Sequence, residues 1–81
     1  MPSKSAVVGS SVGLHARPAA IIAEAADGLG SAVTINGVDA SSSLMIMTLG
    51  AKCGDTVEVA GEDQSAVDSI ATLVEQDLDA D

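Results

Sequence analysis

Apolar and polar residues alternate along this 81-residue chain in segments that predict short strands separated by amphipathic helices. Runs with alternating apolar positions predict strands at 4–8, 31–35 and 56–60, and a further strand that begins at 38–40. Apolar residues at helical spacing predict helices at 16–27, at 44–48 and after Gly61. The predicted order of elements is therefore β-α-β-β-α-β-α.

Several residues mark where these elements begin and end. Asn36-Gly37 supplies the two positive-φ positions of a type I′ hairpin turn between the second and third strands. Pro18 suits the first turn of a helix, where its missing N–H is not needed, and Gly28 ends that helix. The serines at 41–43 offer several N-cap residues for the short second helix.

The same spacing predicts which side chains form the core. The inward face of the first helix should consist of Ala19, Ile22, Ala23 and Ala26. That of the last helix should consist of Val67, Ile70, Leu73 and Val74. Val57 and Val59 should face inward from the last strand. In the short second helix we expect Met45 to face the core.

A hairpin among short strands favours an antiparallel sheet, and the helices need one face of that sheet to bury their apolar stripes. We therefore expect an α+β fold. It should be a two-layer open-faced sandwich, in which a four-stranded antiparallel sheet carries three helices on one face. A chain of this length is expected to form one domain, spanning residues 1–81.

Composition adds that this core is built without aromatic residues. Apolar residues make up 47% of the chain, yet it contains no Phe, Tyr or Trp. The single cysteine, Cys53, has no second cysteine with which to form a disulfide or share a metal, and we expect neither metal nor cofactor. No apolar run is long enough to span a bilayer, and the first residues do not form a signal peptide. We therefore expect a cytoplasmic protein without membrane insertion.

The charge of the chain restricts its partners. Twelve acidic residues against three basic ones give a net charge of −9 at pH 7. This balance excludes nucleic acid as a partner, because binding to phosphate backbones needs clustered Lys and Arg. A small domain with this charge repels its own copies, so we expect a monomer.

The candidate chemistry lies at residues 13–18, Gly-Leu-His-Ala-Arg-Pro. His15, the only histidine, precedes a helix start, where backbone N–H groups and the helix dipole favour an anion. Arg17 adds a permanent cation whose planar fork suits phosphate oxygens. A neutral imidazole also has a lone pair for nucleophilic attack. From these residues alone, an anion site and an ordinary capped helix with a solvated arginine both remain open.

Other kinds of active site find no support in the sequence. The chain has no second histidine, no Cys–His pairing and no Asp–His pair close in sequence, so neither a metal site nor a protease-like triad is indicated. A small hydrolase would also need a base and groups that position water. His15 and Arg17 are the pair of nucleophile and anion receptor that the chain offers.

The segment Gly13-Leu14-His15-Ala16-Arg17-Pro18 resembles the active-site signature of HPr, the histidine phosphocarrier family of the bacterial sugar phosphotransferase system. The resemblance covers nearly the whole chain, including its length, the order of its elements, the hairpin and the segment 44–50. The segment 39–43 and the acidic tail are most similar to actinobacterial members.

This resemblance implies a mechanism. Enzyme I, phosphorylated by phosphoenolpyruvate, would donate a phosphoryl group to Nδ1 of His15, and phospho-His15 would pass it to the IIA domain of a sugar permease. Arg17, with the backbone N–H groups of Ala16 and Arg17, would hold the phosphate oxygens. The protein would be a carrier that forms a phosphohistidine rather than a turnover enzyme. It would share the transfer chemistry with its partners, since phosphoryl transfer depends chiefly on positioning and charge stabilisation.

The resemblance also implies two further features of the second helix. Some HPr lineages carry a regulatory serine at its start, and counting back from Leu49-Gly50 places that serine at Ser42. Ordinary N-capping is the simpler interpretation, and Ser43 replaces the apolar residue that usually follows. The family presents an apolar partner surface on this helix, which would include Leu44 and Met47; core packing is the alternative for each.

Charge on the first helix departs from the family. Many relatives carry basic residues where this chain has Glu24 and Asp27, so Arg17 and Lys52 would provide the remaining electrostatic steering toward acidic partners.

Two alternative functions would use the same fold. A paralogue in a regulatory phosphorelay, such as the nitrogen branch, would use the same His15 chemistry with other partners. A non-catalytic regulatory binding module would typically lack the histidine, so the presence of His15 counts against it.

Overall fold

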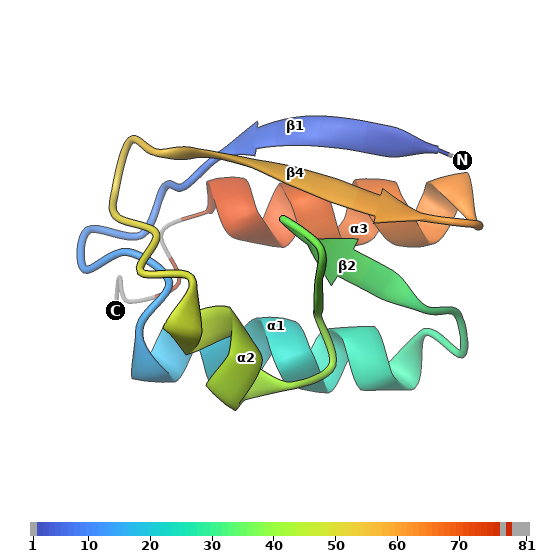
Figure 1. Cartoon of the computed structure of the whole chain (residues 1–81), viewed down its shortest axis with the longest axis horizontal. Coiled ribbons are helices and arrows are strands. Elements are labelled where there is room, and N and C mark those ends of the chain that lie inside the picture. The colour runs from blue at the N-terminus through green and yellow to red at the C-terminus, as the bar shows by residue number, and fades with distance from the viewer. Residues whose placement is uncertain (1, 77, 79–81) are drawn as a thin grey trace.

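The computed structural model describes residues 2–76 and 78. The elements along the chain are β1 (Ser3–Val7), α1 (Ala16–Gly28), β2 (Val33–Ile35), β3 (Val38–Asp39), α2 (Ser43–Thr48), β4 (Thr56–Gly61) and α3 (Gln64–Glu75). Figure 1 shows their arrangement. The predicted order of elements is confirmed, and the largest boundary difference in the strands is at β2, which begins at Val33 instead of Ser31.

The sheet has the strand order β1-β4-β2-β3, and every neighbouring pair is antiparallel. β4 therefore lies inside the sheet, paired with β1 from Val7↔Thr56 to Ser3↔Ala60 and with β2 along its other edge. The hairpin between β2 and β3 has the predicted turn, because Asn36 and Gly37 both have positive φ, 50° and 85°.

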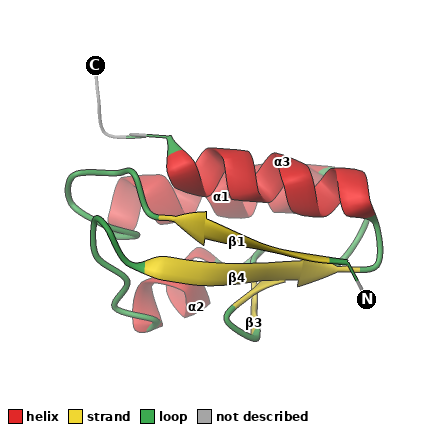
Figure 2. Ribbon diagram, turned by 90° about the horizontal axis from the view of Figure 1, so that it is seen from above, coloured by secondary structure: helices red, strands yellow, loops and turns green. Residues whose placement is uncertain are grey.

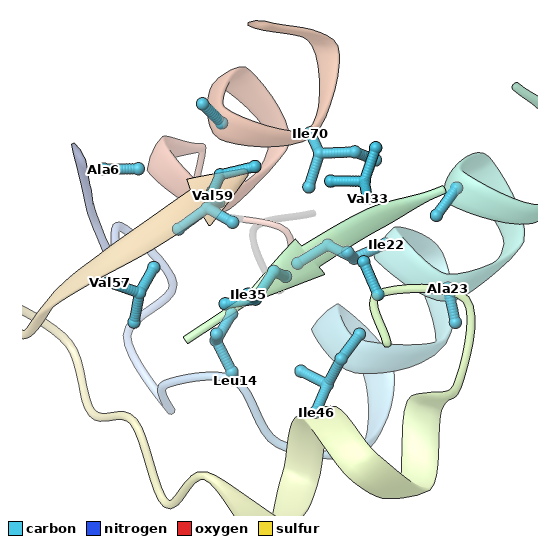
Figure 3. Close-up of a cluster of buried hydrophobic side chains, with 14 of the residues drawn as sticks. Ala6, Leu14, Ile22, Ala23, Val33, Ile35, Ile46, Val57, Val59 and Ile70 are labelled. Atoms are coloured by element: carbon cyan, nitrogen blue, oxygen red, sulfur yellow. The ribbon is translucent and has the colours of Figure 1, made fainter. Parts of the chain in front are cut away.

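The helices lie over one apolar core. α3 packs across β1 and β4, and α1 lies alongside α3 on the same face of the sheet (Figure 2), while α2 packs against α1 and β3. Each helix contributes a fully buried isoleucine to this core: Ile22 from α1, Ile46 from α2 and Ile70 from α3 (Figure 3). The predicted fold class, an α+β open-faced sandwich of a four-stranded antiparallel sheet and three helices, is confirmed.

Most of the predicted core residues are buried. They are Ala19, Ile22, Ala23, Ala26, Val57, Val59, Val67, Ile70 and Val74. Leu73 is only partly buried, at the margin of the core. No helix in the described part of the chain is long and apolar enough to cross a membrane.

The prediction that Met45 faces the core is wrong. Met45 is 43% exposed, whereas Ile46, the next residue, is fully buried. The reason is that a helix of six residues is too short for apolar spacing to determine its rotation. Contact with α1 decides the rotation, and it turns Ile46 toward Ile22 and Ala23 (Figure 3).

Replacement of Ile46 should therefore detach α2 from the core. We expect Ile46→Ala to lower the free energy of unfolding by about 2–5 kcal/mol, because it removes buried methyl groups and leaves a cavity. Met45→Ala, the matched control on the same helix, should cost about 1 kcal/mol or less. Urea unfolding of the two variants measures both values, and a larger loss for Met45→Ala would contradict this packing.

Candidate functional site

His15 is the N-cap residue of α1. Its backbone is extended (φ −94°, ψ −160°), and its carbonyl accepts the first bond of the helix from the N–H of Ala19, at 2.9 Å. Its side chain is exposed and makes no capping hydrogen bond. The imidazole therefore stands at the positive end of the helix dipole without being used to cap it.

The first turn of α1 favours an anion. The N–H groups of a first helical turn have no acceptor within the helix, and this turn carries no acidic side chain. Pro18 is buried within it, while Ala16 and Arg17 are exposed beside His15. Arg17 adds a positive charge to the positive end of the helix dipole. His15, Ala16 and Arg17, which are consecutive in the chain, are thus all exposed at the start of α1.

The loop before His15 is held by its neighbour, the segment that joins α2 to β4. The N–H of Leu14 donates to the carbonyl of Ala51 at 3.0 Å, and the Leu14 side chain, 3% exposed, points into the core near Ile35 (Figure 3). At the start of the loop, Val8 exchanges backbone hydrogen bonds with Gly54 and Asp55, of 2.9 and 2.8 Å. Both ends of the loop are therefore anchored to one segment.

Gly13 fits this loop for two reasons. Its φ is +76°, a conformation that residues with a Cβ atom rarely adopt. A Cβ atom there would also collide with the carbonyl oxygen of Ala51 and lie 2.9 Å from Cα of Lys52. The backbone before His15 thus approaches the 51–52 backbone as closely as a residue without a side chain allows.

Lys52 and Cys53 lie in that neighbouring segment and are exposed. The N–H of Lys52 donates to Oδ2 of Asp55 at 2.9 Å, which closes a tight turn. Cys53 is a free thiol. In the described part of the chain, no three His, Cys, Asp or Glu residues form a group that could hold a metal ion.

Ser42 is the N-cap of α2. Its side chain accepts the N–H of Met45 at 3.3 Å, so the predicted cap falls on Ser42 among the three serines. Ser41 has a different role, since its hydroxyl and its N–H both donate to Oδ1 of Asp39, at 2.7 and 2.9 Å. These two bonds, the hydroxyl bond above all, hold the pKa of Asp39 below its ordinary value of 3.8.

Of the two residues predicted to form an apolar surface on α2, one is exposed and the other packs partly against the core. Leu44 is 67% exposed, whereas Met47 is partly buried and packs against the core. Near this helix and the site, Met45 is exposed against the prediction, and Val12, which the sequence does not single out, is 59% exposed three residues before His15. Nothing in the pattern around Val12 sets it apart from a core valine. Glu24 and Asp27 are exposed on α1, as expected for charged residues.

A family model described as the phosphorylation site of the HPr component of the phosphotransferase system matches residues 2–76. The chain belongs to the HPr family. The phosphocarrier protein HPr of Streptomyces coelicolor is 36% identical over 87 aligned residues, which cover 98% of this chain and 94% of that protein. The resemblance to HPr is therefore confirmed, and the Streptomyces relative agrees with the expected similarity to actinobacterial members.

Solved HPr structures share the whole fold. HPr-C-His from Thermoanaerobacter tengcongensis has a TM-score of 0.87 at 27% identity, over 100% of this chain and 99% of the other. HPr from Bacillus anthracis has a TM-score of 0.83 at 28% identity, over 90% and 95% of the two chains. This chain is thus an HPr phosphocarrier of the phosphotransferase system, built on the family's open-faced sandwich.

The close approach at Gly13 predicts an unequal effect of two glycine substitutions. Gly50, like Gly13, has a positive φ, but a Cβ atom there would meet open space. Gly50→Ala should cost about 1–2 kcal/mol from its backbone conformation alone. Gly13→Ala should cost at least about 1 kcal/mol more, because the 51–52 backbone must also move. Urea unfolding compares the two, and equal losses would contradict the collision at Gly13.

Proposed function

We propose that His15 accepts a phosphoryl group on Nδ1 from phosphorylated enzyme I and transfers it to the IIA domain of a sugar permease. The observation that carries this proposal is the position of His15 at the N-terminus of α1. Its imidazole is exposed there and makes no capping hydrogen bond. Membership in the HPr family supports it independently.

The transfer needs no cofactor. In the first step, the lone pair of Nδ1 attacks the phosphorus atom, and a P–N bond forms on His15. The bond between phosphorus and enzyme I breaks, and its electron pair stays with enzyme I. In the second step a nucleophile of the IIA domain attacks the same phosphorus, and the electron pair of the P–N bond returns to the imidazole. The protein is regenerated after each cycle as a carrier.

The first turn of α1 would stabilise the phosphoryl group. The N–H groups of Ala16 and Arg17 and the Arg17 guanidinium would hold the phosphate oxygens, at the end of the helix where the dipole is positive. No acidic side chain in that turn opposes the incoming negative charge. Positioning and electrostatic stabilisation are the main contributions a protein makes to phosphoryl transfer.

The partner surface would include Leu44, which is largely exposed, and the accessible part of Met47. A surface that contains methionine adapts to several partners, as a carrier between two proteins requires. Lys52 and Arg17 would add positive charge for acidic partners, while Glu24 and Asp27 weaken that steering. We infer that the carrier works as a cytoplasmic monomer, with residues 1–81 as its single domain.

Regulatory phosphorylation at Ser42 is a separate hypothesis. A phosphate on Ser42 would retain oxygens that can accept the N–H of Met45, at a helix N-terminus that favours negative charge. The start of α2 would therefore tolerate the modification. Capping alone accounts for the serine equally well.

The carrier function is tested by incubating the purified protein with phosphoenolpyruvate and enzyme I of the source organism. We expect one acid-labile phosphoryl adduct, visible by ³¹P NMR, and its loss when a IIA domain is added. His15→Ala should form no adduct while its stability changes by about 0.5 kcal/mol or less, since the side chain caps nothing. Ser42→Ala, the control, should still form it. A wild-type protein without adduct, or an adduct that persists in His15→Ala, would refute the proposal.

Arg17→Ala should slow phosphoryl transfer by about 100-fold with the fold retained, because a charged donor to the phosphate oxygens is lost. The transfer rate of Arg17→Lys should lie between those of the wild-type protein and Arg17→Ala, since lysine keeps the charge without the planar fork. Lys52→Ala removes an exposed cation from the neighbouring segment and should have a smaller effect. Rapid-quench rates measure each step, and an unchanged rate in Arg17→Ala would remove the role assigned to Arg17.

A further inference from the structure

A buried hydroxyl lies in the loop that leads to His15, and neither phosphate binding nor docking uses it. Ser10 is fully buried, and it is the one polar residue in the buried set of the described chain. Burial of a hydroxyl is unfavourable unless it is hydrogen-bonded. The position of Ser10 in the core therefore depends on its partners.

Those partners lie beyond the end of α3, far away in the sequence. The Ser10 hydroxyl donates to the carbonyl of Gln76 at 3.2 Å and accepts the N–H of Leu78 at 3.1 Å. Leu78 itself is partly buried against the core. One hydroxyl thus binds a carbonyl and an N–H of the segment that follows the helix, and it uses both its donor and an acceptor position to do so.

The neighbouring residue brings the same two segments together. The N–H of Gly9 donates to the carbonyl of Val74 at 3.0 Å. A Cβ atom at Gly9 would collide with the carbonyl oxygen of Glu75 and lie 2.7 Å from its carbonyl carbon. The end of α3 therefore lies directly against residues 9–10, and Figure 1 shows it beside the loop between β1 and α1.

Ser10 connects this contact to the site. Its carbonyl accepts the N–H of Gly13 at 2.9 Å, which closes the turn from which Leu14 and His15 follow. The side chain of Ser10 thus holds the end of α3, while its backbone holds the turn. Leu14, bonded to Ala51, anchors the loop on one side, and Ser10 anchors it on the other.

We propose that Ser10 is a positioning residue for phosphoryl transfer, whose hydroxyl fixes the loop 9–14 against the end of α3 and so holds His15 in place at the start of α1. The proposal rests on the proposed function of His15. Ser10 acts through the backbone of the turn and touches no reacting atom. A small displacement of a reacting group is enough to slow a transfer step.

The test compares three variants in the enzyme I reaction. Ser10→Ala removes the hydroxyl, Ser10→Thr keeps it, and Asp63→Ala is the control. Asp63 caps the opposite end of α3 through bonds to the N–H and hydroxyl of Ser65, both 3.0 Å. Loss of the Asp63 side chain should destabilise α3 without changing the contacts of the loop 9–14. Ser10→Cys, of similar volume but with a weaker hydrogen-bonding group, replaces Ser10→Ala should that variant not fold.

We expect Ser10→Ala to lower kcat for phosphoryl acceptance by about tenfold with KM for the carrier little changed, because positioning is lost and docking is not. Amide hydrogen exchange at Gly13, Leu14 and His15 should rise by about tenfold or more, since the loop opens locally. Ser10→Thr should restore most of the rate. Asp63→Ala should lower Tm while both kcat and loop exchange stay at the wild-type values.

Two results would overturn the positioning role. One is unchanged loop exchange in Ser10→Ala; the other is faster exchange with unchanged kcat. A loss of rate in Asp63→Ala as large as in Ser10→Ala would likewise assign the effect to the stability of α3 and reject the proposal. If the wild-type protein accepts no phosphoryl group, the proposed function of His15 fails and the positioning role of Ser10 in transfer fails with it. Loop exchange then still decides separately whether the hydroxyl holds the loop.

Discussion

The short loop 9–14, held between two other parts of the chain, is the constraint on which the rest of this structure depends. Backbone hydrogen bonds tie it to the segment after α2, and the Ser10 hydroxyl ties it to the segment after α3. Leu14 then inserts its side chain into the core. Because the loop is fixed on both sides, the helix that follows begins at a defined place, with His15 as its first exposed residue.

The core explains why backbone contacts matter so much here. It consists of Ala, Val, Ile and Leu, without any aromatic side chain. Small side chains let backbones approach closely, as at Gly9 and Gly13, where even a methyl group would collide with a neighbouring carbonyl. Dense packing of many small groups can specify a fold as well as a few large ones do, provided volume and pattern are kept.

The proposed function depends on the local electrostatics at the start of α1 in a strongly acidic chain. The chain carries a net charge of −9, yet the first turn of α1 contains Arg17 and no acidic residue. Under the proposed function, an incoming phosphate would therefore meet the helix dipole and a guanidinium, although the chain as a whole is strongly acidic. In the proposed function, partner choice would depend on that small positive region and on the exposed Leu44 more than on overall charge.

Local interactions allowed the sequence alone to determine much of this protein. The Asn36-Gly37 turn, the first helix with Pro18 in its first turn, and the place of His15 all depend on residues close together in the chain. The family signature is local too. The sequence leaves the start of α2 open among three serines, because each of them could cap a helix that begins at the residue after it.

Only the tertiary structure decided the features that depend on distant partners. Contact with α1 turns Ile46 inward and leaves Met45 exposed, and the pairing of β4 between β1 and β2 places the first strand of the chain beside the last one. Ser10 is read in the sequence as an ordinary loop serine. Its two partners lie 66 and 68 residues away, and no pattern within a single segment carries information about bonds over that separation.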